Sequence, residues 1–307
     1  MQLPSATLLA QSALSGIFIG ALYGLLGLGL SLTWGLLRQI NLAHFALAFL
    51  GAYLTYQLAS VGGMDPLTTL AVIAPAFFAL GVATQWVFAR FNVSPLNSLI
   101  VTFGVTVVIE SVIQSIWTAD FRKLESSYGA VTLKIGALYF PLPELMTLVI
   151  AASLSLLAWV WLRYTDLGRA LRAAAEDAPI AAAFGVNERA LSYLLSGVSA
   201  ALAGAAGLCI ALSYTLAPAQ IYAWVGVVFA VVMMGGIGRP LGPLVAGVII
   251  GVSEALTMAV TAPSWAPLVS FSLLIALLIL RPLVGRHLGL VAALQVGVGH
   301  DVSFLLA

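Results

Sequence analysis

Residues 163–189 read RYTDLGRALRAAAEDAPIAAAFGVNER and lie between two long apolar runs. The chain has 12 Lys and Arg and 11 Asp and Glu residues, and eight of these charged side chains fall in this one segment, four of each sign. The segment is too long for a turn, and its many alanines favour helix over a flexible linker. We therefore predict a folded aqueous loop that contacts another molecule in the water.

The rest of the chain has the composition of a membrane protein. It is 62% hydrophobic, with a mean hydropathy of +1.11, whereas soluble domains are roughly 45–50% apolar. The net charge of +1 argues against a nucleic-acid partner. The sequence therefore predicts an all-α, polytopic helix bundle in a lipid bilayer, with residues 1–307 forming a single transmembrane domain.

The apolar runs give the number of membrane spans. A span needs about 20 apolar residues, and the run at 40–59 opens with polar residues, which is typical of a broken helix. We expect eight to ten spans in all. The nine candidate runs are approximately 12–35, 40–59, 67–89, 97–118, 144–162, 190–212, 220–237, 241–260 and 264–280.

Basic residues are concentrated in cytoplasmic loops of membrane proteins, which predicts the orientation. With nine spans, one set of loops holds only Arg122, Lys123 and Lys134, so these loops face outward. The N-terminus is then outside, and the segment at 119–143 is expected to lie on the outer surface. The opposite set is cytoplasmic and holds Arg38, Arg90, Arg163, Arg169, Arg172, Arg189, Arg239, Arg281 and Arg286.

Small residues recur every four positions in several runs. Such spacing lets helices approach closely, and we expect close helix packing rather than a flexible pathway lining. The glycine- and proline-rich stretch 234–243 predicts a tight cytosolic turn. The repeated small residues are Gly16, Gly20 and Gly24, then Ser196, Ala200 and Gly204, then Gly247 and Gly251.

The polar loop should form two short helices. Pro179 ends or kinks the first, because the residue before a proline is pushed out of helical geometry, and Gly185 is a stop for the second. Arg169, Arg172 and Glu176 share one face, with Arg172 and Glu176 at i,i+4 spacing. An apolar stripe is expected on another face, at Leu167, Leu171, Ala174, Ala178 and Ala181.

An amphipathic helix resting on the lipid surface is the alternative interpretation of this loop. Its charges are balanced, however, and its large apolar anchors are essentially limited to Leu167, Leu171 and Phe184. Docking against a protein partner fits these features better.

Four polar residues in apolar surroundings are candidates for a translocation pathway. Asn41 and His44, close to Arg38, either complete a broken helix or line a pathway. Glu110 and Glu254 lie inside apolar runs, where an unpaired carboxylate costs about 2.5–3.5 kcal/mol. No Lys or Arg lies within either run. Each carboxyl is therefore protonated, hydrogen-bonded within the bundle, or exposed to an aqueous cavity.

The sequence shows no signature of catalysis. It contains no phosphate-binding G-x-x-x-x-G-K-[ST] motif. Its three histidines are scattered without metal-ligand spacing, and its single cysteine, Cys209, lies in an apolar run. We expect no cofactor, metal or catalytic residue in this chain, and any ATP hydrolysis must be carried out by another subunit.

Four stretches of the chain resemble branched-chain amino acid ABC transporter permeases of the LivH type. They are LGRALRAAAEDAPIAAAFGVNERAL in the polar loop, IFIGALYGLLGLGLSLTWGLLRQINLAHFALAFLGAYL, FAVVMMGGIGRPLGPLVAGVIIGVSEAL and LLIALLILRP. The resemblance covers nearly the whole chain in order. The polar loop and the GGIG-to-EAL stretch are its specific parts.

The resemblance implies a permease subunit of an importer in the bacterial inner membrane. Such a subunit pairs with a second, related permease, two ATP-binding subunits and a periplasmic substrate-binding protein. The loop at about 163–189 would then be the coupling element that sits in a groove of the ATPase. Its candidate coupling residues are Gly168, Arg169, Arg172, Asp177 and Gly185, together with the charged Glu176.

The chain departs from this family at one point. Members usually continue the INxAH stretch with Gly-Glu, whereas Phe45 and Ala46 follow His44 here. The substrate is therefore open among branched-chain or related amino acids, amides and urea. Two other functions remain open: an ion-coupled secondary transporter that uses Glu110 or Glu254, and a structural or assembly protein.

Overall fold

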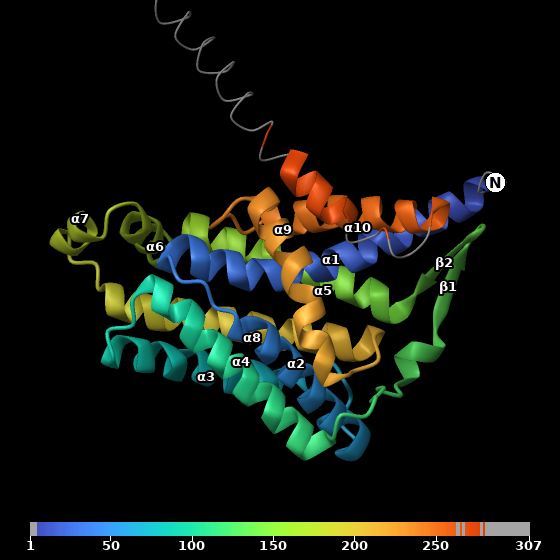
Figure 1. Cartoon of the computed structure of the whole chain (residues 1–307), viewed down its shortest axis with the longest axis horizontal. Helices are drawn as coiled ribbons and strands as arrows, with labels where there is room; N and C mark the ends of the chain where they lie inside the picture. The colour runs from blue at the N-terminus through green and yellow to red at the C-terminus, as the bar shows by residue number, and fades with distance from the viewer. Residues whose placement is uncertain (1–4, 262–264, 266–267, 277–278, 280–307) are drawn as a thin grey trace, which may run out of the picture.

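The protein is a bundle of long helices with a small hairpin at one end (Figure 1). The structure is a computed structural model and describes residues 5–261, 265, 268–276 and 279. The prediction of a polytopic helical bundle is confirmed. The elements are α1 (Ala6–Leu37), α2 (Ala43–Tyr56), η1 (Gln57–Val61), α3 (Leu70–Arg90), α4 (Pro95–Trp117), η2 (Ser127–Ala130), β1 (Thr132–Ile135), β2 (Leu138–Pro141), α5 (Leu142–Tyr164), α6 (Asp166–Glu176), α7 (Ala178–Ala183), α8 (Glu188–Ser213), η3 (Pro218–Trp224), α9 (Val225–Gly235) and α10 (Gly242–Val260).

Seven helical segments among the described residues are long and apolar enough to cross a bilayer. The run at 40–59 forms α2, which continues as a π-helix, η1, and α2 begins beside Leu26 and Gly29 in the interior of α1. The last run, 264–280, lies partly outside the described residues, which include a helical stretch at 268–276. The seven segments are Ala6–Leu37, Leu70–Arg90, Asn97–Trp117, Leu142–Tyr164, Glu188–Ser213, Pro218–Gly235 and Gly242–Val260.

The two ends of the bundle differ in charge. Helices α6 and α7 lie at one end and the β1–β2 hairpin at the other (Figure 1). The hairpin end has only Arg122, Lys123 and Lys134 as its described basic residues. This asymmetry agrees with a cytoplasmic α6–α7 end. The α6–α7 end holds Arg38, Arg90, Arg163, Arg169, Arg172, Arg189 and Arg239.

Helices α1 and α8 form the centre of the bundle. In their most apolar windows, 72% of α1 and 78% of α8 is buried, against 22% of α3 and 17% of α4. Gly16, Gly20 and Gly24 of α1 lie against α10, and a methyl group at Gly20 would collide with the backbone of Gly247. The expectation that the repeated glycines serve close helix packing is therefore confirmed along this α1–α10 contact.

The turn between α9 and α10 is fastened to α1. Gly236 and Gly238 both have positive φ, at 92° and 78°, a region that suits glycine. The Gly238 amide donates to the Ser31 hydroxyl at 3.0 Å and to the Ser31 carbonyl at 3.1 Å. Gly238 also lies so close to Gly35 that a side chain at Gly35 would collide with it.

The segment 119–143, which was expected to face outward, is not a span, as expected, but it contains strand as well as irregular structure. Strands β1 and β2 pair antiparallel, with Thr132 opposite Pro141. A hydrogen bond from the Tyr128 hydroxyl to the Asp65 carboxylate joins this segment to the loop before α3. The segment therefore forms a small hairpin at the end of the bundle opposite α6 and α7, and this is the only sheet among the residues that the structure describes.

Candidate functional site

Helices α6 and α7 form the predicted coupling loop, and local contacts fix its shape. The Thr165 hydroxyl caps α6 by accepting from the Gly168 amide at 3.1 Å, and the Asp177 carboxylate caps α7 by accepting from the Ile180 amide at 3.1 Å. A side chain at Gly168 would collide with the end of α5. Gly185 follows the end of α7 and has a positive φ of 87°. Gly168, Asp177 and Gly185 therefore determine the geometry of the loop.

The prediction of two short helices is confirmed, and the predicted apolar stripe is correct only in part. Leu171 and Ala181 are buried as expected, whereas Leu167 is 48% exposed. The tip of α7 exposes two further apolar side chains, Ile180 at 57% and Phe184 at 86%. An apolar tip beyond the charged face of α6 is a surface suited to burial against another protein.

The charged residues of α6 do not interact as their spacing predicted. Arg169 pairs with Asp166, and this is the one ion pair within the part of the chain that the structure describes. Arg172 and Glu176 form no ion pair despite their i,i+4 spacing, because Arg172 lines a pocket beside α5. Arg38, at the end of α1, donates to the Ala175 carbonyl at 3.1 Å and ties the loop to the bundle.

Asn41 and His44 belong to different environments. Asn41 lines a cavity of about 210 Å³ between α2, α3, α4 and α8, and its buried Oδ1 has no hydrogen-bond partner among the described residues. The His44 ring is buried against Gly29, and its Nε2 lies 3.0 Å from the Leu26 carbonyl oxygen. Asn41 therefore lines a cavity, whereas the His44 ring packs between helices, with its Nδ1 also without a hydrogen-bond partner among the described residues.

Phe45, where the resemblance led us to expect glycine, is an interior residue. It is 1% exposed, and its ring stacks on Phe229 of α9, with ring centroids 6.4 Å apart. The following Ala46 is also fully buried. A carboxylate at this position would be enclosed by apolar side chains, so the Phe-Ala pair matches its surroundings.

Glu110 lies on α4, close to η3. It accepts a hydrogen bond from the Tyr222 hydroxyl at 2.7 Å and a longer one from the Gln114 side-chain amide at 3.3 Å. Tyr222 is 41% exposed, and Gln114 is also exposed. These three polar side chains form a cluster on an outer face of the bundle, and we call this surface the α4–η3 seam.

Glu254 of α10 lies inside the bundle. It is 5% exposed and accepts hydrogen bonds from the Tyr23 hydroxyl of α1, at 3.1 Å, and from the Ser270 hydroxyl. Two donors therefore satisfy this carboxyl where three helical segments meet. This environment suits a packing role. Glu254 and Glu110 each accept a hydrogen bond from a tyrosine, Glu254 from Tyr23 and Glu110 from Tyr222.

Sequence reasoning missed the tyrosine and serine hydroxyls that bond to the two carboxyls, and a pocket that Arg163, Arg172 and Arg239 line together. Tyr23 and Tyr222 are ordinary aromatic residues of apolar runs, and nothing local links them to carboxylates far along the chain. Arg239 was counted only as an indicator of orientation, and Arg163 was counted as such an indicator and as one of the eight charged residues of the segment 163–189. The available signal was that several spans end near a basic residue. The sequence does not show that Arg163 and Arg239 line the same pocket, because this depends on the tertiary fold.

The helical fold and the apolar spans are those of a multi-pass membrane protein. Residues 12–278 match the family described as branched-chain amino acid transport system, permease component. This match covers most of the chain, so the chain belongs to that family. The comparisons do not support the ion-coupled alternative.

Several curated relatives carry matching names. The chain is 27% identical over 289 residues to a high-affinity branched-chain amino acid transport system permease protein, LivH, of Salmonella typhimurium, covering 89% of this chain and 93% of the relative. It is 26% identical over 294 residues to BraD of Pseudomonas aeruginosa, covering 89% and 94%. A probable LivH of Methanocaldococcus jannaschii is 27% identical over 241 residues, covering 76% of each chain. No solved structure shows a significant match.

Proposed function

We propose that this chain is the membrane permease subunit of an ATP-driven importer for branched-chain or related amino acids in the bacterial inner membrane. Family membership is the observation that carries this proposal. The printed names of the relatives support the substrate class. The partners are two ATP-binding subunits, a second related permease and a periplasmic substrate-binding protein.

The α6–α7 loop is the proposed contact with the ATP-binding subunits. Its charged residues are exposed at the basic end of the bundle, and the apolar tip at Ile180 and Phe184 offers the anchor that a protein interface needs. The link from Arg38 to Ala175 supports transmission of movement from this loop to α1.

The α4–η3 seam is the proposed lining of the substrate pathway. A carboxylate that faced lipid would be costly, yet Glu110, Gln114 and Tyr222 cluster on an outer face of the bundle. A pathway formed between this face and the second permease would surround these groups with water or substrate. Asn41 remains a second candidate because of its unpartnered oxygen and its cavity.

Reconstitution tests the overall function. The chain is purified from detergent-solubilised membranes with its bound partners and placed in proteoliposomes with the binding protein. We expect ATP-dependent uptake of labelled leucine, isoleucine or valine, with unlabelled amides and urea as competitors. Uptake that persists without an ATP-binding subunit and follows a proton gradient would contradict the proposal.

Cysteine accessibility tests the pathway, and the chain is suited to it because its single cysteine, Cys209, is buried. Gln114→Cys should react with a membrane-impermeant thiol reagent in the assembled transporter. Val108→Cys is the matched control, since Val108 is 62% exposed and lies about 120° away from Gln114 around the same helix at 3.6 residues per turn. Equal labelling of both variants, or of neither, would contradict the assignment.

A further inference from the structure

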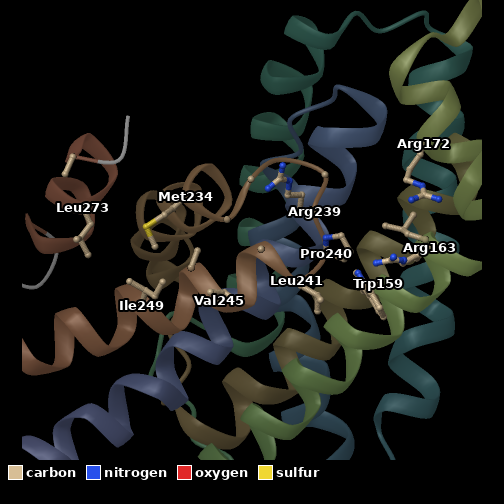
Figure 2. A pocket seen from close by; sticks show the side chains of 17 residues that line it. Trp159, Arg163, Arg172, Met234, Arg239, Pro240, Leu241, Val245, Ile249 and Leu273 are labelled. Carbon is tan, nitrogen blue, oxygen red and sulfur yellow. The ribbon is translucent and has the colours of Figure 1, made fainter. Parts of the chain in front are cut away.

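A large pocket opens at the cytoplasmic end of the bundle, beside the coupling loop. It has a volume of about 1320 Å³ and lies between α5, α6, the turn before α10, α10 itself and the helical stretch at 268–276 (Figure 2). Neither the family match nor the relatives' names assign a role to it. Its two ends differ in chemistry.

Three arginines line the polar part of this pocket. Arg163 ends α5, Arg172 belongs to α6 and Arg239 to the α9–α10 turn (Figure 2). All three side chains are exposed, and none forms an ion pair with a carboxylate among the described residues. No described lining residue is acidic. This end of the pocket is therefore a site of uncompensated positive charge.

Local contacts orient the Arg163 side chain and fix the backbone of the turn that carries Arg239. The Arg163 guanidinium lies over the Trp159 ring, 5.3 Å from its centroid, which orients its planar group. The turn that carries Arg239 is fixed to Ser31 through Gly238. Positioned guanidinium groups of this kind suit a phosphate, which they bind with paired hydrogen bonds.

The other end of the pocket is apolar and opens toward the membrane. Met234, Val245, Ile249 and Leu273 line it (Figure 2), and Val245 and Ile249 are 58% and 48% exposed. Ile249 lies seven residues into α10, so the apolar wall extends about 10 Å below the arginines at 1.5 Å per residue. An acyl chain would fit this wall.

We propose that the pocket binds an anionic phospholipid of the cytoplasmic leaflet. Its phosphate contacts Arg163, Arg172 and Arg239, and one acyl chain lies along Val245 and Ile249. The proposal rests on the proposed orientation, which places these arginines at the anionic inner surface of the membrane, where basic pockets between helices attract acidic headgroups. The lipid joins α5 and α6 to the α9–α10 turn.

Native mass spectrometry of the delipidated permease complex tests this site without any transport measurement. The probes are dioleoyl phosphatidylglycerol, dioleoyl phosphatidylcholine and inorganic phosphate. We expect phosphatidylglycerol to bind at least about tenfold more tightly than phosphatidylcholine, because the two lipids share the phosphate but the choline cation of phosphatidylcholine repels the arginines. Inorganic phosphate at millimolar concentration should compete weakly, because it lacks the acyl chain.

Variants assign the binding to this pocket. Arg163→Gln together with Arg239→Gln should weaken phosphatidylglycerol binding at least about tenfold, whereas Arg90→Gln, a basic residue at the same end but outside the pocket, should not. The two single variants serve if the double variant does not fold. Val245→Trp should weaken lipid binding by filling the apolar wall.

Each contrary result overturns the proposal. Equal binding of the two lipids would show that charge is not recognised, and unchanged binding to the arginine variants would locate the lipid elsewhere. Full competition by inorganic phosphate would identify a soluble anion as the ligand. None of these results depends on uptake, so they are separate from the test of the proposed function.

Discussion

Gly20 of α1 and Gly247 of α10 face each other so closely that a methyl group on either would collide with the backbone carbonyl of the other. The contact lies in the middle of a seam that also brings Gly16 against Gly251. No side chain separates the two backbones here. The contact between α1 and α10 is therefore possible only because these positions carry no side chain. Burial of apolar surface contributes little to the association of helices within a bilayer, so close backbone packing stabilises the contact.

Replacement of Gly247 by leucine should separate α1 from α10. Overpacking of a close contact typically costs about 1–3 kcal/mol, so the melting temperature of the purified protein in detergent should fall by roughly 5 °C. Gly104→Leu is the control, because no atom lies near the position that its side chain would take. Equal melting temperatures for both variants would show that the seam does not limit stability.

The apolar tip of the coupling loop should control ATPase binding. Phe184→Asp removes an 86% exposed ring without disturbing the packing of the loop, and loss of an interface anchor of about 2 kcal/mol weakens affinity more than tenfold. The ATP-binding subunits should no longer co-purify. Phe91→Asp, 73% exposed at the same end of the bundle, should retain them, and co-purification with both variants would refute the docking surface.

Glu110→Gln should reduce uptake about tenfold while the complex still assembles. The amide can still accept from Tyr222, but the negative charge is lost, and hydrogen bonds to charged groups are worth about 1.5–3 kcal/mol. Tyr222→Phe should have a smaller effect of the same sign. The control is Ser253→Ala, since Ser253 bonds within its own helix. Wild-type uptake by Glu110→Gln would remove this residue from the pathway.

The contact between Asp65 and Tyr128 should appear in an alkaline titration. The Tyr128 hydroxyl lowers the pKa of Asp65, and the carboxylate raises the pKa of Tyr128. The interaction is complete between about pH 4 and pH 10, is lost as pH falls through the lowered pKa of Asp65, and is lost as pH rises through the raised pKa of Tyr128.

Absorbance of tyrosinate provides the measurement for this contact. In Asp65→Asn, Tyr128 should ionise at a lower pH than in the wild type, closer to its ordinary value of about 10. Asp120→Asn is the control, because Asp120 bonds to Thr118. Superimposable titration curves for the wild type and Asp65→Asn would exclude the contact in solution.

Local signals in the sequence were sufficient to predict the loop and the glycine seam. Pro179 breaks the loop into two helices through its own backbone geometry, and Gly185, with a positive φ, follows the end of the second. The four-residue spacing of Gly16, Gly20 and Gly24 has few explanations in a membrane helix other than close packing. In both cases, the cause and the structure lie within the same few residues.

Contacts between distant segments could not be predicted in this way. Tyr23 is 231 residues from its partner Glu254, and Tyr222 is 112 residues from Glu110. Helical spacing suggested that Arg172 pairs with Glu176, but the fold offers Arg172 a pocket instead. Likewise, the sequence could not show whether the His44 ring lines a cavity or packs against Gly29, as the structure shows.

The fastening of the α9–α10 turn to Ser31 has a mechanical consequence. With the turn fixed near one end and the glycine contacts along their length, α1 and α10 cannot slide past each other, and together they form a stiff lever. Arg38, at the end of α1, connects this lever to Ala175 in the proposed coupling loop. A displacement of the loop would therefore reach Tyr23 and Glu254, deep in the bundle, without a flexible joint in between.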